Sequence, residues 1–236
     1  MEQFVIKPII PIEIGGVDIS FTNSSLFMIL SVVCSTLFLA LCLRKRTLIP
    51  NKAQSIPEGL YEFISGLLRE NVGVEGLKYF SFIFTVFLFV AFGNLLGLVP
   101  YSFTFTSHLT AVGALSLIAL ALNVIVGIRK KKFGWLRTFL PRGIPWIMAP
   151  LIIPIEMISF LSKPFSLSVR LVANMTVGHI MLKIIAGFVV GLGILGMVPL
   201  LFDAIIVCFE IFISLLQAFI YTVLTCIYLS DAIHEH

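Results

Sequence analysis

The feature that most constrains this chain is a series of long apolar runs that carry very little charge. They occupy residues 25–43, 78–99, 107–128, about 146–192 and 197–230. A helix needs about 20 such residues to cross the hydrocarbon core of a bilayer. Charged residues make up 12% of the chain, against roughly 25% in soluble domains, which is too few to cover a water-facing surface. The sequence therefore predicts an all-α integral membrane protein with about five transmembrane helices.

The chain divides into a short polar lead, residues 1–24, and a single membrane domain, residues 25–236. Within the domain, the segment PEGLYEFISGLLREN, opened by Pro57, repeats its apolar residues at helical spacing. That spacing predicts an amphipathic helix on the membrane surface or packed in the bundle. The stretch FGWLRTFLPRGIPW at 133–146 combines Trp and Arg, which suits the membrane interface.

The last two apolar runs are unusually long and predict a helical hairpin over about 146–230. A helix of more than 40 residues measures about 60 Å, roughly twice the hydrocarbon thickness. The first arm must therefore break or lie strongly tilted, and Pro150, Pro154 and Pro164 permit kinks. Glycines between 191 and 196, followed by Pro199, predict the turn.

Basic clusters orient the chain in the membrane. Residues 44–46 (RKR) and 129–132 (RKKK) both favour the inner face. Alternation of the spans then places the N-terminus outside and the C-terminus inside. The net charge of +4 fits this topology better than it fits nucleic-acid binding. The four cysteines lie inside apolar runs and are read as packing residues, so neither a disulfide nor a metal site is expected.

The first arm of the hairpin carries a polar stripe. At about 100° per residue, its six polar positions fall within a wedge of about 80°. A charge inside a membrane costs roughly 2.5–3.5 kcal/mol on insertion scales, so such a stripe indicates function. The residues of the stripe are Glu156, Ser159, Lys163, Ser166, Arg170 and Asn174.

The second arm carries polar residues seven positions apart, which keeps them near one helical face. With the first arm they form two groups that meet at Arg170. This arrangement predicts two offset aqueous half-paths for protons. The inner group is Glu156, Ser159, Lys163 and Ser166; the outer group is Asn174, His179, Asp203, Glu210 and Gln217.

Each of these residues also has a structural alternative. Arg170 could pair with Glu156 or Glu210, and His179 could serve only to hydrogen-bond a neighbouring helix. Lys163 could extend to the inner interface. The hydroxyls of Ser159 and Ser166 could bond carbonyls of their own helix. Asp203 could be simply hydrated near the outer turn.

Three segments carry a family resemblance that extends over most of residues 25–233. The runs SKPFSLSVRLVANMTVGH (162–179) and LLQAFIYTVLTCIYLSDAI (215–233) resemble the last two helices of the ATP synthase subunit a family. The run GNLLGLVPYSFTFTSHLT (93–110) is similar to an earlier span and loop of that family. The resemblance implies that Arg170 faces a carboxylate of a rotating c-ring. It also implies that His179 and Glu210 form the acid–histidine pair of the outer path.

The function implied is that of a stator subunit of the membrane sector of ATP synthase, conducting protons to and from the c-ring. The partners implied are the c-ring, the subunit b stalk and the rest of the synthase, within a lipid bilayer. No cofactor and no catalysis by this chain are expected, since it lacks the loop G-x-x-x-x-G-K-[ST]. The location implied is a bacterial inner membrane, with the mitochondrial inner membrane as the alternative.

Two other functions remain as alternatives to the rotary role. A secondary transporter would show paired inverted halves with broken helices, and no internal symmetry is seen here. A membrane scaffold subunit of a respiratory complex would not need a polar stripe.

Overall fold

The computed structural model describes residues 6–11, 13–14, 17–18, 20–44, 51–99, 102–131 and 148–233. Its described part contains six α-helices, and five stretches are long and apolar enough to cross a membrane. The prediction of an all-α membrane protein is thereby confirmed. The interface stretch predicted at 133–146 lies outside the described residues. The helices are α1 (Asn23–Cys42), α2 (Lys52–Val72), α3 (Phe80–Gly97), α4 (Leu109–Lys131), α5 (Ala149–Gly191) and α6 (Met197–Ile233).

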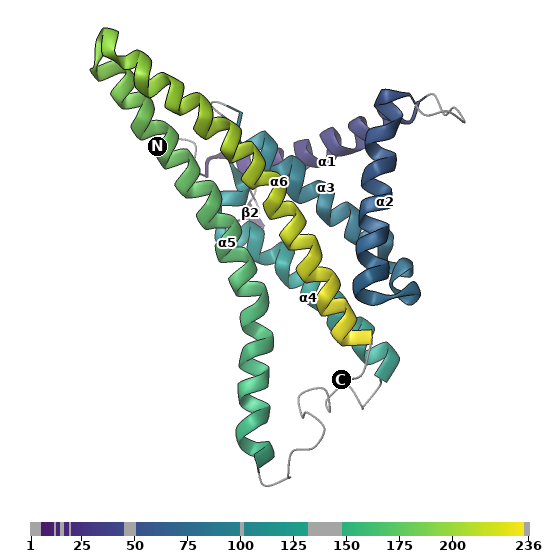
Figure 1. The fold of residues 1–236 in the computed structure, drawn as a ribbon. Helices are drawn as coiled ribbons and strands as arrows, with labels where there is room; N and C mark the ends of the chain where they lie inside the picture. Colours follow the sequence, from purple (N-terminus) through teal and green to yellow (C-terminus); the bar gives the residue numbers. More distant parts are fainter. Residues whose placement is uncertain are drawn as a thin grey trace.

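The hairpin of α5 and α6 forms one side of the molecule. Its two helices lie together near the turn and diverge towards their other ends (Figure 1). Helix α6 contacts α5 on one side and also packs against α2, α3 and α4. Its other contacts bury the fully enclosed side chains of Tyr221 and Leu229 among residues such as Ile64 and Leu68 of α2. The core therefore lies between α6 and helices α2, α3 and α4. One face of α5 lies outside this core and is open to other contacts.

Residues 8–22 of the lead form short strands, which the sequence patterns do not predict. Strand β1 (Pro8–Ile10) pairs antiparallel with β4 (Phe21–Thr22), and β2 (Glu13–Ile14) pairs with β3 (Val17–Asp18). Helix α1 begins directly after β4. The hydroxyl oxygen of Thr22 accepts a hydrogen bond from the Ser25 amide at 3.4 Å, which caps the helix.

Helix α2 is the predicted amphipathic helix, and it packs within the bundle. It begins at Lys52, five residues before Pro57, where the sequence pattern predicts its start. Asn51 precedes it in an extended conformation and allows the earlier start, while Pro57 removes one backbone donor inside the helix. Gly73 ends the helix with a φ of 80°, a conformation that glycine adopts without a steric penalty.

Helix α5 runs without a break over 43 residues, although Pro154 and Pro164 lie inside it. At 1.5 Å per residue its length is about 65 Å, so of the two predicted solutions the structure excludes a break in the helix. The short 3-10 segment η6 (Gly193–Gly196) joins it to α6. A Cβ at Gly196 would lie 2.3 Å from the carbonyl oxygen of Val189, so this close approach requires glycine.

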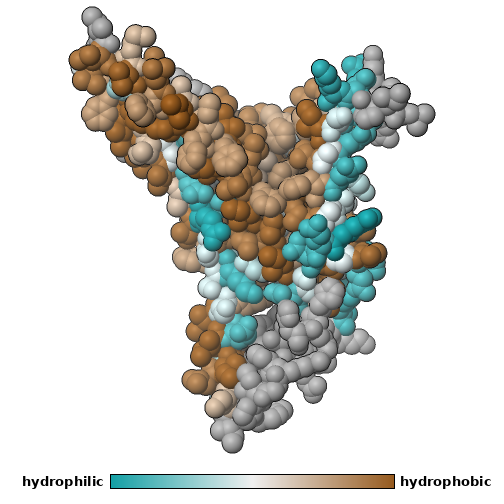
Figure 2. Space-filling model, in the orientation of Figure 1, coloured by the Kyte–Doolittle hydropathy of each residue, from teal (hydrophilic) through white to brown (hydrophobic). Residues whose placement is uncertain are grey.

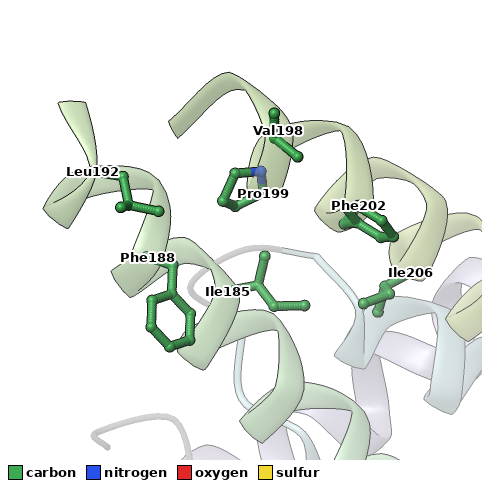
Figure 3. Close-up of a pocket in the computed structure, with 7 residues that line it drawn as sticks. All are labelled: Ile185, Phe188, Leu192, Val198, Pro199, Phe202 and Ile206. Carbon is green, nitrogen blue, oxygen red and sulfur yellow. The ribbon is translucent and has the colours of Figure 1, made fainter. Parts of the chain in front are cut away.

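A hollow of about 400 Å³ lies between α5 and α6 near the turn. The two helices face it with apolar side chains alone, including Phe188 from α5 and Phe202 from α6 (Figure 3). It contains no polar lining atom that could carry a proton. The polar chemistry of the hairpin therefore lies further along both helices.

Candidate functional site

Part of the polar stripe of α5 faces away from the bundle, because Ser159, Ser166 and Arg170 are exposed. Leu167 and Leu171 are 2% and 0% exposed and hold an adjoining face of the helix, about 60–100° around the helix from Arg170, against its neighbours. Because Ser166 and Arg170 lie outside this face, their side chains are exposed. Figure 2 shows a hydrophilic band that follows α5 between broad hydrophobic surfaces. These exposed residues are therefore open to a partner on the outside of the hairpin, whereas Lys163 and Asn174 of the same stripe turn towards α6.

The rotation of α5 is fixed from behind by α4. The hydroxyls of Ser116 on α4 and Ser168 on α5 lie 2.6 Å apart and are both buried. Ser168 also donates to the carbonyl of Pro164, at 2.8 Å. The Ser168 side chain is two residues from Arg170, so this contact helps to direct the arginine outward.

Arg170 has no ion pair within the described part of the chain. The salt bridges there join Lys130 to Glu75 and Lys163 to Asp231. Neither Glu156 nor Glu210, the two partners considered for Arg170 in a structural role, is brought to it. The arginine is thus an exposed cation on a membrane-spanning helix with no carboxylate of the described residues against it.

One helical turn beyond Arg170, the hairpin is joined by a pair of amides. The Asn174 side chain donates to the Gln217 carbonyl oxygen at 3.0 Å. Gln217 is 2% exposed, and its own amide nitrogen has no partner among the described residues. A buried amide with an unused donor can bind water or another polar group at this level.

His179 and Glu210 both lie further towards the turn, and both are 6% exposed. The Glu210 carboxylate rests on the backbone of Gly178, where an added Cβ would come within 1.7 Å of its Oε1 atom. Neither Glu210 oxygen has a hydrogen-bond partner among the described residues. Asp203, one heptad away on α6, acts on Glu210 as a second negative charge. Glu210 is therefore a buried carboxylate at the contact of α5 and α6, with half-buried Asp203 as its charged neighbour.

The His179 ring has a partner outside the hairpin. Its Nε2 atom lies 3.1 Å from the hydroxyl of Thr104, in the loop between α3 and α4. Thr104 also contacts the carbonyl of Gly97, at 3.3 Å. The structural alternative for His179, a hydrogen bond to a neighbouring element, is therefore realised.

The side chains of the inner group are more exposed than those of the outer group. Lys163 lies 3.6 Å from Asp231 and 5.0 Å from the ring centroid of Tyr228, both on α6. Lys163 therefore turns towards α6. Ser159 is exposed and Glu156 is half-buried on α5, and Glu156 makes no ion pair with the described residues. No group of three or more metal-ligating side chains occurs in the described part of the chain.

Comparison with known proteins identifies the family to which this chain belongs. The family model of the ATP synthase A chain matches residues 25–230. ATP synthase subunit a of Rhodospirillum rubrum is 53% identical over 237 residues, covering 100% of this chain and 98% of that protein. The chain belongs to the ATP synthase subunit a family. The subunit a of Paramagnetospirillum magneticum, 52% identical over 243 residues, agrees with this assignment.

Membership of the subunit a family decides against the two alternative functions, a secondary transporter and a respiratory scaffold. As a subunit a, the chain is a multi-pass membrane protein of ATP synthesis and proton transport, in the stator of the membrane sector. The subunit a proteins of Rhodospirillum rubrum, Paramagnetospirillum magneticum and Rhizobium rhizogenes, to which this chain is similar, are bacterial.

Sequence reasoning missed several residues of this subunit a site. Asp231 continues the heptad spacing of Asp203, Glu210 and Gln217 by two further steps, and that spacing could have found it. No spacing or periodicity in the sequence indicated a role for Thr104 or Gly178. Thr104 approaches the site across 75 residues of chain, and Gly178 matters through the side chain that it lacks.

Proposed function

We propose that this chain conducts protons through two offset half-paths that end at either side of Arg170. The outer half-path comprises Asp203, Glu210, His179, Asn174 and Gln217. The inner half-path comprises Ser166, Lys163, Ser159 and Glu156, together with Asp231. The observation that carries this proposal is the exposed arginine, which has no partner carboxylate in the described residues and lies between the two polar groups.

Arg170 is suited to separate the two half-paths. A guanidinium remains protonated at any accessible pH, so a proton cannot pass through it by hopping. Its positive field favours the ionised form of a carboxylate that comes to face it. A carboxylate of a rotating c subunit would lose its proton near Arg170 to the inner path. It would pass Arg170 in its ionised form, take up a proton from the outer path, and make almost a full turn in its neutral form before releasing that proton to the inner path.

The partners are then the c-ring against the open face of α5, and subunit b with the rest of the synthase. The N-terminus lies outside and the C-terminus inside, in the inner membrane of a bacterium. In this orientation each proton that moves inward releases about 2.3 kcal/mol per 100 mV of membrane potential. Neither a cofactor nor a nucleotide site of this chain takes part.

The test is ATP-driven proton pumping in inverted vesicles that carry Arg170→Ala, with assembly of the complex quantified. Ser162→Ala is the matched control, because Ser162 is exposed on the same helix and its hydroxyl bonds to the helix carbonyl of Ser159. We expect pumping to be lost in assembled Arg170→Ala complexes and kept in Ser162→Ala. Pumping at the wild-type rate in Arg170→Ala would return the arginine to a structural role.

A further inference from the structure

The end of the hairpin, where α5 turns into α6, carries only apolar side chains. Residues 184–202, which include the turn, contain no charged and no polar side chain, whereas a turn in water usually carries polar residues. Val190 is 85% exposed and Leu195 is 71% exposed. The turn bonds its own backbone, from the Leu192 amide to the Phe188 carbonyl at 3.0 Å and from the Leu195 amide to the Leu192 carbonyl at 3.2 Å. This end of the hairpin is therefore built to lie in the hydrocarbon of the bilayer.

The hollow between α5 and α6 lies within this apolar end (Figure 3). Its volume is about 400 Å³, and the described residues line it with apolar side chains alone. Water would find no hydrogen-bond partner there, and an engineered apolar cavity of about 150 Å³ stays dry and takes up benzene. The hollow therefore suits an apolar ligand. Its lining includes Ile185, Phe188 and Leu192 of α5, with Val198, Phe202 and Ile206 of α6.

The lining residues form two rows, one along each helix. At 1.5 Å per residue, the row from Ile185 to Leu192 is about 11 Å long and the row from Val198 to Ile206 is about 12 Å long. Because α5 and α6 are joined by the turn and pack against each other, the two rows face each other along an elongated groove (Figure 3). An extended acyl chain contacts both rows along their length, which a compact ligand does not.

A membrane can supply two apolar occupants, an acyl chain or a side chain of a neighbouring subunit. Phe188 and Phe202, which line the hollow, are exposed, so the hollow opens towards the surroundings of the hairpin. Its open side is continuous with the exposed apolar surface at Val190 and Leu195, which faces hydrocarbon. An acyl chain can enter from that surface without leaving the bilayer, and it gains dispersion contacts on two sides. These features favour the acyl chain.

We propose that the hollow is a lipid-binding site, which holds one acyl chain of a bilayer phospholipid between the rows of α5 and α6. The chain fills space that the side chains of the hairpin leave between the two helices. Phe188 lies about 27 Å along α5 from Arg170, so this site is distinct from the face that the c-ring would contact at the arginine. The inference does not depend on the proposed half-paths.

Ile185→Trp fills the hollow from α5 with a larger apolar side chain. Val190→Trp is the matched control, because it adds a bulky side chain to the same helix at an exposed residue that does not line the hollow. The whole synthase is reconstituted with a phosphatidylcholine that carries a photoreactive diazirine in one acyl chain. The complex is washed in lipid-free detergent to remove loosely bound lipid and is then irradiated. Labelled peptides are quantified by mass spectrometry, normalised to assembled subunit a.

We expect the label to remain on peptides from residues 185–206 of the wild-type chain after the wash. It should fall about tenfold or more in Ile185→Trp, because the added ring occupies the place of the acyl chain. Val190→Trp should stay within about twofold of wild type, since its hollow is unchanged.

Absence of this label from the washed wild-type complex would overturn the inference, because the hollow would then be covered by a neighbouring subunit or by freely exchanging lipid alone. Equal labelling of Ile185→Trp and wild type would also overturn it, as would an equal fall in the two tryptophan variants. If Ile185→Trp does not assemble, Val198→Trp fills the hollow from α6 and is read against Val190→Trp in the same way.

Discussion

The Glu210 carboxylate and the backbone of Gly178 are in direct contact across the hairpin. A Cβ on residue 178 would lie 1.7 Å from Oε1 and 2.6 Å from Cδ of Glu210. Glycine is therefore what allows an acidic side chain of α6 to lie directly against the backbone of α5, at the residue before His179. The position of Glu210 in the outer group depends on this missing side chain.

Gly178→Ala should consequently displace Glu210 and lower ATP-driven proton pumping about tenfold or more. Overpacking of this kind typically costs about 1–3 kcal/mol, and 1.4 kcal/mol corresponds to a factor of ten in rate. Gly187→Ala on the same helix is the control, since a Cβ there meets nothing within 4 Å. Equal pumping by the two variants at equal assembly would show that Glu210 does not need this position.

Exchanging the two side chains of the Asn174–Gln217 pair should lower proton pumping less than removing one of the two amides. Gln217→Leu removes the acceptor for the Asn174 amide, 3.0 Å away, and leaves a polar group without its partner. We expect pumping to fall about fivefold, the effect of about 1 kcal/mol. The double variant Asn174→Gln with Gln217→Asn keeps the summed length of the two side chains. It should recover most of the pumping rate, and no recovery would mean that the two amides act separately.

Lys163 and Asp231 should show a small coupling in a double-mutant cycle. Their side chains are 32% and 35% exposed, and such a pair typically contributes about 0.2–1 kcal/mol. Pumping rates of Lys163→Gln, Asp231→Asn and the double variant give the coupling energy. We expect the double variant to pump up to about fivefold faster than the product of the two single effects predicts. Strict additivity would mean that the pair does not act as a unit.

His108 should make the stability of the complex dependent on pH. Its ring stacks on Phe103 with centroids 5.1 Å apart, and its Nε2 atom is buried without a partner among the described residues. Burial lowers the pKa of His108 below its ordinary value of 6.5. The unfolded chain therefore binds the proton more readily than the folded chain does, and stability rises with pH in this window.

The contribution of His108 is complete above pH 6.5 and is lost as the pH falls through 6.5 towards the lower pKa of the folded state. Thermal inactivation of the wild-type complex and of His108→Leu, measured between about pH 5.5 and 7.5, isolates this contribution from the other titrating groups. The loss of stability on acidification should be smaller in His108→Leu. Parallel curves for the two proteins would contradict the prediction.

Helical periodicity in the sequence locates most of the candidate site. The polar residues of α5 follow its 3.6-residue repeat, and those of α6 follow a spacing of seven, so each set can be assigned to one face. The length of α5 is likewise evident from its apolar run, although its prolines leave open whether it bends or tilts. The same reasoning places the start of α2 too late, because Pro57 is tolerated inside a helix that begins after Asn51.

The sequence by itself determined the membrane class, the five spans, the long hairpin and the polar faces of its two helices, because hydropathy and periodicity are properties of single segments. The tertiary structure alone decided which residues meet: Thr104 with His179, Lys163 with Asp231, and Glu210 with Gly178. Such meetings depend on the relative height and rotation of neighbouring helices. Packing across the whole bundle sets the height and the rotation of each helix. The periodicity of a single segment contains no information about either.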